Sequence, residues 1–334
     1  MINIVLIGAG KLGSRHLQAL SQINLKDTNI FAVDLNESTL NLAKNRFNEM
    51  PKNENITSIN YIKDIKDLKI KNIDLALIAT TSEHRKIVVE ELCRLYDVKN
   101  VILEKFLFQD EDSYSEVAKI LEKSKTSAWV NCPRREWSFY KDLKKTLANS
   151  KILKFDVIGT KWSIATSAIH FIDTISYLIE STDFEISKLN FGNSYVPAYS
   201  IITGPRESKY IEFFGSMHGR FADSTFFNFI CLEEETTFTI NIQTENETYN
   251  IYEELGKYYV ISNKGSNISV HEKTLEMPYQ SQLTNLVAES IISKGECSLT
   301  KYTESSKLHI SLLKPYLNYL SDMQDKSIKI CPIT

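Results

Sequence analysis

Apolar and polar residues follow two different patterns along the chain. In the first part, short apolar runs alternate with stretches of helical periodicity. The apolar runs predict strands at 2–7, 29–34, 58–61, 74–79, 100–104 and 127–131, and the periodic stretches predict helices at 12–23, 37–48, 64–68, 83–95 and 111–124. Short strands separated by helices of this size indicate right-handed βαβ units and a parallel sheet that is covered on both faces.

From about residue 125 the pattern changes to strand-like alternation. A helix is predicted over 137–149, and Thr236–Ile242 places its apolar residues on one face, as a half-buried antiparallel strand does. Strands are predicted at 151–158, 187–193, 208–216, 224–232, 236–243, 246–252 and 257–261. A chain of 334 residues is long enough for two domains. We therefore predict an α/β protein, with a doubly wound Rossmann-type parallel sheet in residues 1–125 and an α+β domain with an open, mostly antiparallel sheet in residues 126–334.

A glycine-rich turn follows the first predicted strand. Glycines occupy the three positions of a G-x-G-x-x-G pattern where the apolar run ends and the helical pattern starts. In a dinucleotide site the first glycine permits the sharp turn, the second lets the backbone approach the pyrophosphate, and the third lets the helix pack closely on the strand. The helix start also offers free N–H groups to the phosphates. The residues predicted to bind the cofactor here are Gly8, Ala9, Gly10, Lys11, Leu12 and Gly13.

An acidic residue, Asp34, ends the second predicted strand. It lies about 20 residues beyond the last glycine, where a carboxylate is expected to hydrogen-bond the adenosine ribose. The same carboxylate would repel a 2′-phosphate, so NAD is predicted as the cofactor rather than NADP. The alternative is that Asp34 only caps the helix that follows it.

The composition excludes several classes of protein. The formal net charge of −3, with basic residues dispersed among acidic ones, gives no reason to expect nucleic-acid binding. No apolar stretch approaches membrane-spanning length, and the first strand does not resemble a signal peptide, so we expect a cytoplasmic protein and no membrane partner. Five scattered cysteines show no metal-type spacing, so reduced thiols and no metal site are expected.

Polar residues follow two more of the predicted parallel strands. Thr80, Thr81 and His84 come after the strand at 74–79 and are predicted to line the nicotinamide side of the cofactor. Glu104 and Lys105 follow the buried strand at 100–104. Ligands of such sheets bind beyond the carboxyl ends of the strands, so both segments are candidate site residues. The alternative for the charged pair is an ion pair that faces solvent.

Taken together, GAGKLGSRH, the strand-end acid, ATTSEH and EKF resemble the glucose–fructose oxidoreductase and inositol dehydrogenase (Gfo/Idh/MocA) family. The resemblance implies that Lys105 contacts the reacting substrate hydroxyl and that Glu104 helps to place the nicotinamide ribose. Thr81 and Phe106 replace two prolines of the family. The second proline usually follows a cis peptide bond, which would cost about 3 kcal/mol before Phe106, so we expect the backbone there to differ and to shift Lys105.

A second chemical element lies in the later domain, where the apolar spacing from Ser167 to Ile179 is helical. The family shows D-x-G-x-H-x-x-D in this helix. His170 falls on the catalytic histidine, and Asp173 on a trailing acid that we interpret as structural. Thr166 replaces the leading acid, and a hydroxyl orients an imidazole but does not stabilise its charged form as a carboxylate would.

These residues suggest hydride transfer between a nicotinamide and a secondary hydroxyl of a sugar, polyol or nucleotide-activated sugar. His170 is predicted as the acid/base and Lys105 as the polarising group, both in contact with the substrate, together with Thr166. The alternative for His170 is a helix histidine in a domain interface. Arg134 and Arg135 would suit an anionic substrate, or else they balance Glu136 at the surface.

Two further functions stay open. The same fold with bound NAD could carry out redox-neutral sugar chemistry, such as epimerisation or hydrolysis, or the protein could be a dinucleotide-binding regulatory protein without activity. The substitution at Thr166 and the lost prolines favour the regulatory alternative. In each case we expect a small-molecule carbohydrate ligand and a homodimer or homotetramer formed through the open sheet of the second domain.

Overall fold

The computed structural model describes residues 1–192, 199–203, 209–264 and 267–334. Two compact units divide these residues. The first unit comprises residues 1–108, 112–136 and 278–305, and the second comprises 109–111, 137–277 and 306–334.

The first unit is built on a seven-stranded sheet with the order β3-β2-β1-β5-β7-β8-β19. Its strands are β1 (Ile2–Ile7), β2 (Thr28–Val33), β3 (Ile56–Ile62), β5 (Leu75–Ile78), β7 (Asn100–Leu103), β8 (Ser127–Val130) and β19 (Thr300–Lys301). All neighbours pair in parallel except β19, which is antiparallel to β8. The strand order reverses direction between β1 and β5, and ligands of such sheets bind at this point, beyond the carboxyl ends of the strands.

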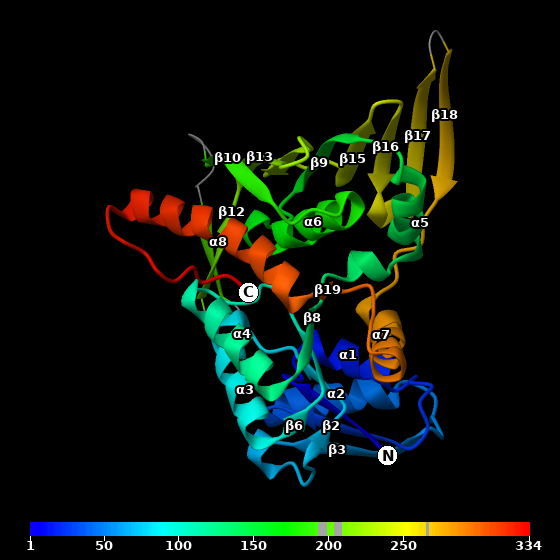
Figure 1. The fold of residues 1–334 in the computed structure, drawn as a ribbon, viewed down its shortest axis with the longest axis vertical. Coiled ribbons are helices and arrows are strands. Elements are labelled where there is room, and N and C mark those ends of the chain that lie inside the picture. The colour runs from blue at the N-terminus through cyan, green and yellow to red at the C-terminus, as the bar shows by residue number, and fades with distance from the viewer. Residues whose placement is uncertain (193–198, 204–208, 265–266) are drawn as a thin grey trace. The chain divides into compact units, whose positions relative to one another are not determined.

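Helices flank this sheet, as Figure 1 shows in blue, cyan and orange. They are α1 (Gly13–Leu20), α2 (Glu37–Asn48), α3 (Ser82–Leu95), α4 (Asp112–Ser124) and α7 (Gln280–Lys294). Helix α7 comes from late in the chain and packs on α1. Its residues Val287, Ala288 and Ile291 belong to the same apolar core as Leu17 and Leu20 of α1.

The second unit is built on an eight-stranded sheet with the order β10-β13-β14-β9-β15-β16-β17-β18. Its strands are β9 (Ile152–Thr160), β10 (Phe184–Phe191), β13 (Gly215–Phe221), β14 (Phe226–Leu232), β15 (Thr239–Thr244), β16 (Glu247–Tyr252), β17 (Lys257–Lys264) and β18 (Asn267–Thr274). Only the pair β14–β9 is parallel among the described strands of this sheet. The unit also contains α5 (Ser138–Leu147), α6 (Ile164–Ile179), most of α8 (Tyr302–Gln324), and a two-stranded sheet of β11 (Tyr199–Thr203) and β12 (Lys209–Phe213).

The two faces of the larger sheet differ in chemistry. Phe155 and Val157 of β9 are fully buried on the face that packs on α6. The intervening Asp156 lies in register with Asn228 on one side and with Asn241 on the other. Asn228 donates a hydrogen bond to Asp156 at 2.6 Å. The face away from α6 therefore carries a row of polar side chains that crosses neighbouring strands.

The predicted fold class is confirmed, and the differences are local. The first unit extends past residue 125 to include β8, and it also takes α7, so its outline differs from the predicted division at 125/126. The predicted strand at 208–216 is two strands, β12 and β13, which separate before Gly215, a residue with φ of +119°. The predicted helix at 64–68 is a single 3-10 turn, Ile65–Asp67.

Candidate active site

The glycine-rich turn after β1 is shaped by close backbone contacts. Gly8 has a φ of +90°, and a Cβ atom there would lie 2.8 Å from the carbonyl of Ala79 at the end of β5. A Cβ atom on Gly13 would lie 1.8 Å from the carbonyl oxygen of Gly8. Both positions therefore require glycine, because a side chain would collide with backbone atoms.

The same turn leaves room and hydrogen-bonding capacity for a phosphate. A Cβ atom on Gly10 would meet no atom within 4 Å, so this residue faces open space. No side chain caps the amino end of α1, whose N–H groups and dipole favour an anion. Within the described residues, the Thr80 hydroxyl after β5 is buried without a hydrogen-bond partner. These features fit a dinucleotide held between the two turns.

Asp34 joins this turn to the end of β2. Its carboxylate is buried and accepts hydrogen bonds from the N–H of Ala9 at 2.9 Å and of Asn36 at 2.8 Å. Helix α2 is capped by Asn36, which accepts from the N–H of Ser38 at 2.8 Å, so the capping role considered for Asp34 belongs to Asn36. The predicted contact of Asp34 with the ribose stays a prediction.

Glu104, directly after β7, is buried in a hydrogen-bonded cluster. His16 of α1 faces it with Nε2 2.9 Å from Oε1, and the amide of Asn131, after β8, donates to the same oxygen. Glu104 is 5% exposed and His16 is 2% exposed. The alternative of a solvent-facing ion pair between Glu104 and Lys105 is therefore wrong, because the carboxylate is enclosed and pairs with His16.

Two residues of α7 close this cluster into a ring. Asn131 donates to the side-chain oxygen of Gln280 at 2.9 Å, and Gln280 donates to the hydroxyl of Thr284 at 2.8 Å. Thr284 Oγ1 lies 2.9 Å from His16 Nδ1. The ring of His16, Glu104, Asn131, Gln280 and Thr284 thus connects α1, α7 and the ends of β7 and β8. It fixes the backbone from which Lys105 extends.

The surroundings of Glu104 keep its carboxylate charged. Burial raises its pKa, but the hydrogen bond and positive charge of His16 oppose this, with further contributions from Asn131 and Lys105. The net result is a pKa below the ordinary value. A carboxyl whose folded-state pKa is lowered stabilises the fold above its unfolded pKa and loses that contribution as the pH falls through the folded value.

Replacing Glu104 with glutamine should therefore destabilise the protein in a pH-dependent manner. At neutral pH we expect a loss of about 2–3 kcal/mol in unfolding free energy, because the buried hydrogen bonds of His16 and Asn131 would lose their charged acceptor. The deficit relative to the wild type should shrink as the pH falls below about 4.5. Denaturant titrations from pH 7 to acid measure it. Glu54→Gln, at an exposed pair with Lys52, is the control and should show no such trend.

Lys105 lies between buried residues and is itself half-buried. The Lys105–Phe106 peptide bond is cis, so the departure expected at Phe106 is not found. Arg85 of α3 is 1% exposed and donates to the carbonyls of Phe106, Leu107 and Thr80, at 2.9 Å for Leu107. The turns after β5 and β7 are thus held together by one guanidinium group, which the sequence pattern did not single out.

The remaining predicted cofactor residues are more exposed. Lys11 and Leu12 are exposed in the glycine-rich turn, and Arg46 of α2, another residue missed from the sequence, donates to the carbonyl of Lys11 at 2.7 Å. Thr81 precedes α3 at its N-cap position, and His84 is exposed in the first turn of that helix. Their contacts with the cofactor stay predictions.

The two predicted arginines differ in their surroundings. They belong to the 3-10 turn Pro133–Glu136, where Arg135 is buried and Arg134 is half-buried. The carboxylate of Glu136 accepts a hydrogen bond from the N–H of Ser298 at 2.7 Å. A purely surface role is therefore wrong for Arg135, whereas substrate binding by either arginine stays a prediction.

The candidate residues of the second unit lie on α6, which begins one turn earlier than the sequence predicts. Thr166 and His170 are both half-buried and lie one helical turn apart, while Asp173 is fully buried. The Thr166 hydroxyl donates to the carboxylate of Glu212 on β12 at 3.0 Å. Lys105 belongs to the first unit and His170 to the second, so their meeting in one active site stays a prediction.

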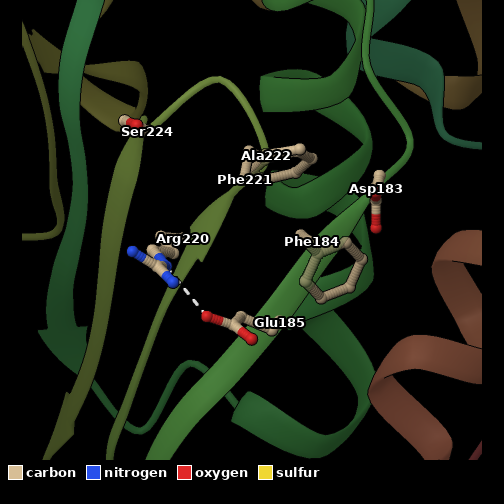
Figure 2. Close-up of a pocket in the computed structure, with 7 residues that line it drawn as sticks. All are labelled: Asp183, Phe184, Glu185, Arg220, Phe221, Ala222 and Ser224. Carbon is tan, nitrogen blue, oxygen red and sulfur yellow. Dashed lines mark hydrogen bonds and ion pairs between the residues drawn. The ribbon is translucent and has the colours of Figure 1, made fainter.

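A surface pocket of about 290 Å³ in the second unit is lined by residues other than the predicted site residues. Figure 2 shows it at β10 and β13, where the exposed side chains of Arg220 and Glu185 form an ion pair at 2.8 Å. None of the predicted site residues lines it. In the described ranges, no group of three metal-binding side chains occurs, and no helix combines the length and apolar character needed to cross a bilayer.

Comparison with known proteins agrees with this architecture. Residues 2–132 match the profile of an oxidoreductase family with an NAD-binding Rossmann fold, GFO_IDH_MocA. No curated protein sequence matches the chain.

Solved structures share the fold over nearly the whole chain. A Gfo/Idh/MocA family oxidoreductase from Vibrio cholerae has a TM-score of 0.70 at 12% identity, covering 98% of this chain and 100% of that one. Gal80p from Saccharomyces cerevisiae, in a super-repressor mutant form, has a TM-score of 0.70 at 13% identity, covering 99% and 98%. UDP-N-acetylglucosamine 3-dehydrogenase from Acidithiobacillus ferrooxidans has a TM-score of 0.66 at 11% identity, covering 94% and 96%.

The motifs at β1, β2, β5 and β7 lie on the parts of the fold where the family resemblance placed them. The amino-terminal part of the chain therefore matches the NAD-binding Rossmann domain of the Gfo/Idh/MocA oxidoreductase family, and a solved structure of that family shares the fold along nearly the whole chain.

Proposed function

We propose that the protein is an NAD-dependent dehydrogenase that acts on a secondary hydroxyl of a sugar, polyol or nucleotide-activated sugar. The observation that carries the proposal is the buried ring around Glu104. The ring holds the backbone of Lys105 at the edge of the sheet where the dinucleotide site opens, and it leaves the lysine side chain half-exposed.

NAD, when bound, supplies the hydride acceptor. The glycine-rich turn would hold its pyrophosphate, and Asp34 its adenosine ribose. Lys105 favours the alkoxide-like form of the substrate oxygen, because an ammonium stabilises negative charge that develops beside it. His170 takes the hydroxyl proton or returns it in the reverse direction, a role in which an imidazole typically contributes a rate factor of about 10² to 10⁴.

The class of substrate is inferred from two arginines and from one similar structure. The half-buried Arg134 and buried Arg135 suit an anionic group such as a phosphate or a carboxylate. The similar fold of UDP-N-acetylglucosamine 3-dehydrogenase agrees with a nucleotide-activated sugar. We also propose a homodimer or homotetramer formed through the open sheet face, where the polar row around Asp156 would make a hydrogen-bonded interface.

Two other functions are alternatives to the dehydrogenase, and the experiment below tests them too. Redox-neutral sugar chemistry with bound NAD would use the same residues. A regulatory, non-enzymatic role is favoured by Thr166 in place of an acid and by the fold shared with Gal80p.

The experiment has two steps. NADH and NADPH are first titrated by fluorescence, and NADH is expected to bind more tightly. NADH formation is then followed over a panel of sugars, sugar acids, polyols and nucleotide sugars, with product analysis in parallel. Net NADH supports the dehydrogenase. Sugar conversion without NADH supports the redox-neutral alternative, and NADH binding without any conversion supports the regulatory role.

A further inference from the structure

A buried carboxylate lies behind the helix that carries His170. Glu212 of β12 is 5% exposed, and its Oε1 accepts a hydrogen bond from the Thr166 hydroxyl at 3.0 Å. Thr166 and His170 are half-buried, one turn apart on α6. Residues four apart on a helix lie side by side, with Cβ atoms about 5–6 Å apart.

The negative charge of Glu212 acts on several buried titratable groups nearby. Burial, and then the charge of Glu212, raises the pKa of Cys331 to about 12. Burial also raises the pKa of Tyr316 of α8 and of Cys231 of β14, with a smaller contribution from Glu212 in each case. All three groups are therefore neutral at pH 7.

We propose that Glu212 is a positioning residue for His170. Through the hydroxyl of Thr166 it supplies a buried negative charge one helical turn from the imidazole, orients that turn and favours the protonated imidazole. Thr166 therefore relays to α6 the effect of a carboxylate that belongs to β12. The part of this inference that concerns proton transfer rests on the proposed function, whereas the effect on the imidazole does not.

Other charged or titratable groups belong to the elements that pack on α6 and are included in the test. They are Asp173 on α6 itself, Asp142 and Lys144 of α5, Lys154 and Asp156 of β9, Cys231 of β14, and His309 and Tyr316 of α8. Lys144 pairs with Glu180 at 2.7 Å. Asp173 is fully buried on α6 itself, so it is the main competing source of negative charge.

The experiment follows the imidazole of His170 in the full chain by NMR. The chain has six histidines, and the spectrum of His170→Gln identifies the signals of His170. The pH midpoint of those signals is measured in the wild type and in Glu212→Gln, Thr166→Val and Thr166→Ser. Glu253→Gln is the matched control, because Glu253 is 4% exposed in the same unit and accepts a hydrogen bond from Tyr140 at 2.6 Å.

Glu212→Gln should lower the midpoint by about half to one pH unit, because removal of a nearby negative charge disfavours the imidazolium. Thr166→Val should act in the same direction, because it removes the hydroxyl that connects the carboxylate to this turn of α6. Thr166→Ser should restore the midpoint, and Glu253→Gln should leave it unchanged. If Asp173→Asn lowers the midpoint while Glu212→Gln does not, or if all midpoints agree, the inference is wrong.

Activity provides the second measurement. With a substrate identified in the panel, Glu212→Gln should lower kcat about tenfold, shift the acidic limb of the pH profile to lower pH and leave NADH affinity unchanged. Turnover that requires His170 but is indifferent to Glu212, with an unchanged midpoint, overturns this inference alone. A shifted midpoint in a protein without turnover overturns the proposed function and supports the structural role of Glu212.

Discussion

Lys105→Met is expected to lower kcat by about 10²- to 10³-fold, while NADH binds as in the wild type. Methionine keeps much of the length and packing of the lysine stem but removes the ammonium that would stabilise the developing alkoxide. Because Lys105 is half-buried between buried neighbours, the methionine side chain should be accommodated without steric conflict. Steady-state kinetics with a substrate from the panel and NADH titration measure the two effects separately.

The control is Lys99→Met, before the amino end of the same strand. Lys99 pairs with Asp74 at 2.7 Å, and its side chain is 68% exposed. This variant should keep full turnover, since ligands of a parallel sheet bind at the opposite edge. His170→Ala should resemble Lys105→Met, with a loss of about 10²- to 10⁴-fold. Full activity of either folded variant would contradict the proposed mechanism.

Gly13→Ala should destabilise the dinucleotide-binding unit by about 3 kcal/mol. The added methyl group would lie 1.8 Å from the carbonyl oxygen of Gly8 and 2.9 Å from its carbonyl carbon. Both are backbone atoms, so no rotamer change relieves the clash, and either the turn or α1 has to move. Denaturant unfolding gives the loss of stability, and NADH titration should show a parallel loss of binding.

Gly10→Ala separates an effect on cofactor binding from an effect on stability. Its methyl group would meet nothing within 4 Å, so the stability without cofactor should match the wild type. NADH affinity should nevertheless fall about 100-fold, because the methyl group takes up the space through which the pyrophosphate approaches the backbone. If Gly10→Ala bound NADH normally, the dinucleotide would have to lie elsewhere.

The sequence predicted the first unit closely because each of its elements carries a local signal. Helix α2 has the predicted bounds of 37–48, and β1 the predicted bounds of 2–7. Strand order and the dinucleotide turn follow from the βαβ pattern, in which each short apolar strand leads into a helix. The location of Glu104 beyond β7 was predictable for the same reason.

The partners of the site residues were not predictable. Gln280 and Thr284 complete the ring around Glu104, but their helix lies far along the chain and carries no motif that points to the first strands. Glu212 occupies an ordinary position in a strand pattern, and only the packing of β12 on α6 brings it to Thr166. Substrate specificity is expected to depend on the loops at 160–168, 194–207 and 262–280, whose conformations do not follow from the sequence pattern. The second loop lies largely outside the described residues, and the first includes the start of α6.

The return of the chain to the first unit has a consequence for biosynthesis. His16 and Thr284 are 268 residues apart, and α1 shares its core with α7. The ribosome synthesises the amino end first. Leu17 and Leu20 therefore lack α7, the helix that covers them, until almost the whole polypeptide has been made. We therefore expect this apolar patch to stay uncovered during most of translation, and the packing of α1 to be completed late in folding.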